Sequence, residues 1–125
     1  MLQWGNLVRR KLSSISILNK MLTAIKNLLG FGPKTDFSAL VQEGAIILDV
    51  RSKGEYASGH IKGSINIPVD QLSGNLGKFK DKNKTIITCC ASGMRSASAK
   101  GILSSNGYSR VHNGGSWMRL SQKIN

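Results

Sequence analysis

The strongest constraint on the fold of this chain comes from two short runs of mainly apolar residues, 45–50 and 85–89. A strand with one face in water alternates apolar and polar side chains, whereas a strand covered on both faces is apolar along most of its length. Both runs have the length of a strand, and neither alternates. We therefore predict two buried parallel strands whose sheet is covered on both faces.

Turn and cap residues divide the rest of 34–125 into short units. Thr35 and Asp36 are good N-caps for a helix that begins near Phe37. Strands that alternate with helices at these lengths are typical of an α/β sheet with right-handed crossovers. We predict one α/β domain with a small, mostly parallel open sheet flanked by helices on both faces. The other predicted elements are helices over 52–57, 70–76 and 96–105, strands over 64–67 and 110–112, and a last helical turn with Trp117 and Leu120.

Residues 1–33 differ from this domain, and we interpret them as a basic amphipathic extension. Apolar residues recur three and four positions apart over 7–29, which predicts a helix, and the glycines and proline of 30–33 end it. No apolar run approaches the roughly 18–20 residues of a membrane-spanning helix. Three interpretations stay open: an extension without function, a targeting peptide, and a weak contact with a membrane surface through 7–29.

Net charge and cysteine content limit the kinds of partner and the cellular compartment that we expect for this protein. The chain has 125 residues, too few for two ordinary domains, and a formal charge of +12. This positive charge is compatible with binding to nucleic acid, to an anionic membrane or to a small anionic substrate, and also with a basic surface that binds no partner. Net charge alone does not distinguish these possibilities. Cys89 and Cys90 are adjacent, which disfavours a disulfide between them. Free thiols favour the cytoplasm, with an organelle matrix or a membrane surface as the alternative if the extension targets or anchors the chain.

The most informative site is the segment that follows the second buried run. Cys90 stands where that strand ends and the next helix begins, a junction at which open α/β sheets bind ligands. Backbone N–H groups of a tight loop and the positive end of the helix can stabilise a thiolate there, and we expect the thiol to face the crevice. Gly93 permits backbone angles that a larger residue resists, and Arg95 either anchors the loop or holds an anion.

Three motifs follow one another in order between Asp36 and Leu120, a range that makes up most of the chain. The first consists of ILDVR at 47–51, EY at 55–56 and GHIKGSINIP at 59–68. The second is CASGMR at 90–95, and the third includes the glycines and tryptophan of 107–117. Together they resemble the rhodanese-like sulfurtransferases of the single-domain type. The phosphatases that resemble this site have five residues between Cys and Arg, whereas this loop has four. The loop length therefore favours sulfur transfer over phosphate chemistry.

This resemblance implies a thiosulfate sulfurtransferase in which Cys90 carries the sulfur. Cys90 attacks a donor such as thiosulfate, sulfite leaves, and an acceptor then removes the sulfur from the Cys90 persulfide; the acceptor is cyanide in vitro and a thiol physiologically. The expected partners are a small anionic donor and a thiol or sulfur-acceptor protein, without nucleic acid or cofactor. The alternative is a persulfide carrier that a partner protein loads. The loop residues that would cradle the persulfide are Ala91, Ser92, Gly93, Met94 and Arg95.

Several nearby residues are expected to support this site. We interpret Asp49 and Arg51 as architectural, Ser96 as a support of the loop, and His60 as a residue that fixes a turn. Cys89 either packs in the core or protects an oxidised Cys90. Consecutive residues of a strand point to opposite faces, so the two sulfurs should diverge and no metal site is predicted.

Overall fold

The computed structural model describes residues 14–25 and 34–125. The chain divides into two compact units, Met1–Thr35 and Asp36–Asn125. In the first unit, residues 14–25 form a helix whose side chains are all exposed; the rest of the predicted helix over 7–29 lies outside the described residues. Within the described ranges, no helix is long and apolar enough to cross a membrane.

The second unit is built on a four-stranded sheet of the order β2-β1-β3-β4 in which every pair is parallel. This arrangement confirms the predicted parallel α/β fold. Because β1 and β3 are the central strands, their residues are buried almost throughout, as their apolar sequences predict. The strands are β1 (Ile46–Asp49), β2 (Ile65–Asn66), β3 (Ile86–Cys90) and β4 (Val111–Ser116).

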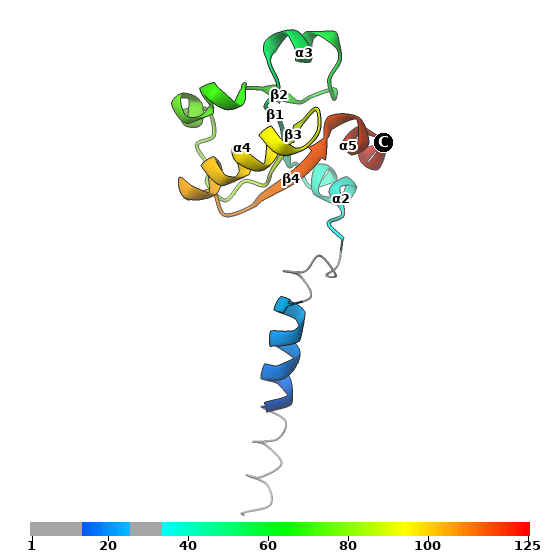
Figure 1. The fold of residues 1–125 in the computed structure, drawn as a ribbon, viewed down its shortest axis with the longest axis vertical. Coiled ribbons are helices and arrows are strands. Elements are labelled where there is room, and N and C mark those ends of the chain that lie inside the picture. Colours follow the sequence, from blue (N-terminus) through cyan, green and yellow to red (C-terminus); the bar gives the residue numbers. More distant parts are fainter. Residues whose placement is uncertain (1–13, 26–33) are drawn as a thin grey trace, which may run out of the picture. The chain divides into compact units, whose positions relative to one another are not determined.

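Helical segments cover both faces of this sheet (Figure 1). Helix α4 (Met94–Ser105) and the 3-10 segment η1 (Val69–Lys78) pack on one face, where Leu48 and Ile86 point. Helices α2 (Phe37–Gln42) and α5 (Trp117–Ile124) lie side by side on the other face, where Ile87 points. Alternation along β1 and β3 thus divides the core into two clusters. A short helix, α3 (Lys53–Ser58), follows β1.

Two elements differ from the sequence prediction. The segment predicted as a helix over 70–76 is the 3-10 segment η1, which contains Gly74 and Gly77; glycine is a poor former of α-helix. The last strand was expected over 110–112, but β4 continues to Ser116 through Gly114. A Cβ atom on Gly114 would lie 2.8 Å from the carbonyl oxygen of Thr88 and 2.9 Å from Leu120 Cδ2. Glycine is therefore required where β4 passes between β3 and α5.

We expect Gly114→Ala to lower the free energy of unfolding by about 1–3 kcal/mol, the usual cost of forcing an extra group into a packed core. Urea denaturation followed by circular dichroism measures this change. Gly101→Ala is the matched control, because a Cβ there would meet nothing within 4 Å. Gly101 lies inside α4, so this control should stabilise the protein by up to about 1 kcal/mol. Equal effects of the two substitutions would contradict the packing argument.

Candidate active site

Cys90 is the last residue of β3, and its sulfur lies beneath the loop that follows. Cys90 Sγ accepts hydrogen bonds from the backbone N–H of Gly93 at 3.0 Å and of Ser96 at 3.4 Å. Ser96 belongs to the first turn of α4, so the sulfur occupies the position of a helix cap. Two backbone N–H groups that can stabilise a negatively charged sulfur therefore already point at Cys90 Sγ.

The side chain of Cys90 is wholly buried, at 0% exposure, in the cluster beneath α4. The expectation that the thiol faces the crevice is therefore wrong for this conformation. The physical reason is that β3 runs one residue further than predicted, so Cys90 follows the alternation of the strand toward α4. A donor must reach the sulfur through the loop, whose Ala91, Ser92 and Met94 are exposed.

Gly93 sets the shape of the loop. Its φ of +108° lies in the region that favours glycine, and it comes directly before the first residue of α4. A Cβ on Gly93 would also meet the Cα of Gly115 in β4 at 3.5 Å. The turn therefore brings the backbone of the loop close to β4 and directs the N–H of Gly93 at the sulfur.

Arg95 anchors the loop to α3. Its guanidinium forms two hydrogen bonds with the carboxylate of Glu55, at 2.7 Å and 3.0 Å. Ser52 caps α3, and the same carboxylate accepts from the backbone N–H of Ser52 in a capping box. Of the two roles that the sequence left open for Arg95, the structure shows anchoring. Arg95 and the Ser52 N–H lower the pKa of Glu55 to about 2.

We expect Arg95→Gln to raise the pKa of Glu55 toward its ordinary value of 4.5, because the Arg95 contact is the largest cause of the lowered value. A lowered pKa in the folded state adds stability that is complete above the unfolded value and is lost as the pH falls toward 2. NMR titration of the Glu55 carboxyl carbon in both proteins measures the shift. Lys53→Gln, which removes a neighbouring exposed charge on α3, is the control. Identical titration curves for wild type and Arg95→Gln would refute the anchoring.

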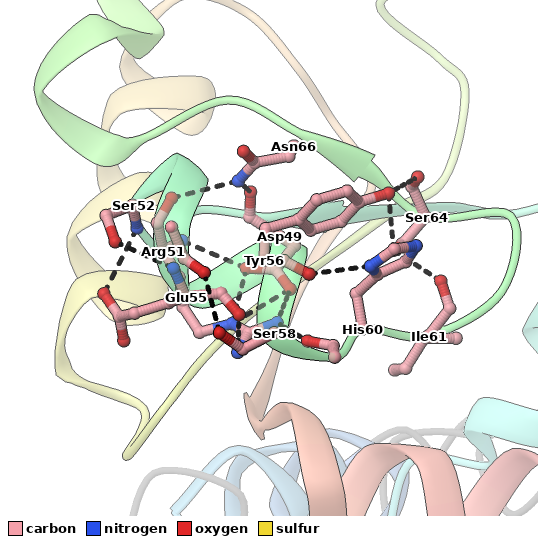
Figure 2. Close-up of polar contacts among 12 residues, drawn as sticks. Asp49, Arg51, Ser52, Glu55, Tyr56, Ser58, His60, Ile61, Ser64 and Asn66 are labelled. Atoms are coloured by element: carbon pink, nitrogen blue, oxygen red, sulfur yellow. Dashed lines mark hydrogen bonds and ion pairs between the residues drawn. The ribbon is translucent and has the colours of Figure 1, made fainter.

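Asp49 and Arg51 form a buried ion pair at the end of β1, as Figure 2 shows. Arg51 Nη2 lies 2.7 Å from Asp49 Oδ2, and Arg51 Nε contacts both carboxylate oxygens. The guanidinium also donates to the carbonyls of Glu55 and Gly59 and lies over the ring of Trp117, 4.5 Å from its centroid. This pair therefore joins β1 to α3, to the following turn and to α5, which is an architectural role.

Ser96 connects the base of the loop to two strands. Its Oγ donates to Asn113 Oδ1 at 2.6 Å and lies 2.8 Å from Thr88 Oγ1, while Thr88 Oγ1 donates to the Ser96 carbonyl. Asn113 Oδ1 also accepts from the N–H of Gly115. These contacts hold the first turn of α4 against β3 and β4. The sequence did not point to Thr88 or Asn113 as site residues, and no local pattern marks them. Glu55 stands in the first motif without an assigned role, although its capping pattern with Ser52 is a local signal.

The remaining candidates have structural contacts. His60 Nδ1 lies 2.8 Å from the carbonyl oxygen of Tyr56, and the two rings stack with centroids 3.7 Å apart. Cys89 points into the opposite core cluster from Cys90, and burial followed by the nearby Asp49 raises the pKa of its thiol to about 12. These facts favour packing over a protective role for Cys89.

Across 14–25 and 34–125, no three His, Cys, Asp or Glu side chains are placed to hold a metal ion.

The fold and the site define a class: α/β domains that hold a cysteine sulfur at the end of a central parallel strand, among N–H groups of the following loop and helix. The Rhodanese-like domain family matches residues 34–118. The chain belongs to this family, and the predicted family is confirmed.

Known proteins of this kind are similar over most of the domain. Thiosulfate sulfurtransferase PspE of Escherichia coli is 39% identical over 69 residues, 54% of this chain and 66% of PspE. Thiosulfate sulfurtransferase GlpE of Pseudomonas fluorescens is 35% identical over 83 residues, 64% of this chain and 72% of GlpE. The chain spans less of other relatives, such as 19% of a tRNA sulfurtransferase of Thermoplasma acidophilum.

Solved structures show the same likeness. A rhodanese with anions from E. coli has a TM-score of 0.57 and 36% identity, and the match covers 60% of this chain and 89% of that one. Human single-domain sulfurtransferase TSTD1 has a TM-score of 0.56 and 29% identity, and the match covers 65% of this chain and 88% of that one.

Proposed function

We propose that this protein is a thiosulfate sulfurtransferase that carries sulfane sulfur on Cys90. The observation that carries the proposal is the pair of N–H groups, from Gly93 and Ser96, that donate to Cys90 Sγ. A thiolate and a persulfide both place negative charge on sulfur, and preorganised N–H donors stabilise such charge. The names of two sequence relatives, both thiosulfate sulfurtransferases, support the same reaction.

The reaction has two steps. Cys90 Sγ attacks the outer sulfur of thiosulfate; a new S–S bond forms, the S–S bond of the donor breaks, and sulfite leaves with the electron pair. The acceptor then attacks the outer sulfur of the persulfide, and the electron pair of the broken S–S bond returns to Cys90. The carrier is a side chain, so the scheme uses no cofactor.

Steady-state kinetics test this proposal. With thiosulfate and cyanide varied together, we expect saturation by thiosulfate and the parallel double-reciprocal lines of ping-pong catalysis. The six-residue loop also leads us to expect no hydrolysis of aryl phosphates.

The alternative to a thiosulfate sulfurtransferase is a persulfide carrier that a partner protein loads. Loading by a cysteine desulfurase, without turnover of thiosulfate, would favour that alternative.

We also propose a thiol or a sulfur-acceptor protein as the physiological partner, without nucleic acid, in the cytoplasm. Cys89 and Cys90 are both unpaired, which suits a reducing compartment. A weak contact with a membrane surface through 7–29 is a second proposal, and the exposed apolar side chains of the helix over 14–25 favour it. They are Ile15, Ile17, Leu18, Met21, Leu22 and Ile25.

Co-sedimentation with vesicles tests the membrane contact. Residues 1–34 hold six Lys and Arg and no acid, so we expect the full chain to bind anionic phosphatidylserine vesicles and to release them in high salt. Leu18→Asp and Leu22→Asp together place two acids on the apolar face and should abolish binding. A control with Ser16→Asp and Thr23→Asp adds the same charge on polar positions of the helix. If both double variants lost vesicle binding equally, the added negative charge alone would explain the loss, and a role of the apolar face would be refuted.

A further inference from the structure

A pocket of about 520 Å³ lies beside the active-site loop, and neither step of the proposed reaction uses it. Ala91 and Ser92 of the loop form part of its lining. Helix α5 contributes Arg119 and Lys123, and α2 contributes Phe37. The remaining lining comes from β4 over 113–116. This volume lies within the range of about 300–1,000 Å³ that is usual for pockets that bind small molecules.

The charge of this pocket is positive. Its lining includes two cations, Arg119 and Lys123, and no acidic residue. Both side chains are exposed. Among the described residues, neither forms an ion pair: Lys123 Nζ lies 5.5 Å from the centroid of the Phe37 ring, and Arg95, the other cation near the loop, is already paired with Glu55. Residues 82–125 contain no Asp or Glu, so the loop, β4 and α5 bring no acid to the pocket.

The position of the pocket distinguishes the two reactants. In thiosulfate the anionic group is bonded directly to the sulfur that is attacked, so this group must lie close to Cys90 Sγ and to the N–H groups around it. Cys90, however, does not line the pocket, which begins at the two residues that follow it. A ligand whose anion is several bonds away from its reacting sulfur fits this arrangement better. A small thiol with a carboxylate has that form.

We propose that Arg119 and Lys123 bind the carboxylate of a small acceptor thiol while its sulfur reaches the Cys90 persulfide. This inference rests on the proposed sulfur transfer and names the class of its acceptor. In the transfer, the acceptor thiolate bonds to the outer sulfur of the persulfide, the S–S bond to Cys90 breaks, and its electron pair returns to Cys90 Sγ. The product is the persulfide of the acceptor, and no other oxidant or reductant takes part.

Acceptor kinetics test the role of Arg119. With thiosulfate as donor, kcat/KM is measured for 3-mercaptopropionate and for neutral 3-mercaptopropanol, and the ratio of the two values is compared among variants. Arg119→Gln should lower this ratio about fivefold, as the loss of one exposed charge contact predicts, and adding Lys123→Gln should lower it further. Arg110→Gln is the matched control, because Arg110 is exposed and directly precedes β4, at the end opposite the loop. The proposal would be overturned if Arg119→Gln left this ratio unchanged. It would also be overturned if the substitution raised KM for thiosulfate and left the preference between the two thiols unchanged.

A binding measurement separates this inference from the proposed function. The unreactive thioether 3-(methylthio)propionate is titrated into the reduced wild-type protein, and the backbone N–H signals of Ser92 and Gly115 are followed by NMR. We expect saturable shifts that weaken about fivefold in Arg119→Gln and are absent with 3-(methylthio)propanol. Shifts with the carboxylate but no persulfide from thiosulfate would refute only the thiosulfate reaction. Equal shifts with the two thioethers, or none, would refute the pocket even if sulfur transfer is confirmed.

Discussion

Cys90→Ser is expected to abolish persulfide formation and to lower thiosulfate turnover at least about a thousandfold, as the loss of a covalent nucleophile does in other enzymes. The hydroxyl oxygen is smaller than sulfur and stays protonated at neutral pH, so it does not attack sulfane sulfur. The N–H groups of Gly93 and Ser96 can still find an oxygen acceptor there, so the loop should keep its shape. Loss of activity would then report chemistry and not unfolding.

Intact mass spectrometry measures this effect directly. After incubation with thiosulfate and removal of the donor, the wild-type protein should gain the mass of one sulfur atom and lose it again when cyanide is added. Cys89→Ala should behave like the wild type, because Cys89 is wholly buried on the other side of β3 and its raised pKa of about 12 keeps its thiol protonated. A gain of sulfur that survives in Cys90→Ser would mean that another residue carries it.

Asp49→Ala is expected to lower the free energy of unfolding by about 3–5 kcal/mol, the usual result of removing one partner of a buried ion pair. Arg51 is only 4% exposed, and Asp49 accepts from its Nε and Nη2. Without the carboxylate, the guanidinium stays charged in the interior and loses its partner. Such a loss is a large part of the roughly 5–15 kcal/mol that holds an ordinary domain together.

Urea denaturation monitored by circular dichroism measures the change, with Asp70→Ala as the control. Asp70 is exposed, so its removal should change stability by no more than about 0.5 kcal/mol. If Asp49 is architectural, the folded fraction of Asp49→Ala should still form the Cys90 persulfide. A variant with normal stability but without the persulfide would assign Asp49 to the chemistry instead.

The sequence was a good guide wherever the signal was local. The apolar runs at 45–50 and 85–89 predicted β1 and β3, because a strand covered on both faces needs apolar residues along its length. Asp36 caps α2 as predicted, through the N–H of Ala39. The ends of elements were less certain: β3 extends to Cys90, and β4 extends to Ser116. These ends depend on pairing with neighbouring strands, which local patterns do not contain.

What the sequence determined by itself is the order of strands and helices and the place of Cys90 at the junction of a strand and a helix, since both depend on residues close together in the chain. Only the tertiary structure decided that Arg95 pairs with Glu55, forty positions away, and that Ser96 joins Asn113. It also decided that the Cys90 sulfur lies beneath its loop. The strand order β2-β1-β3-β4 brings these distant residues together, and such contacts depend on the folded sheet as a whole.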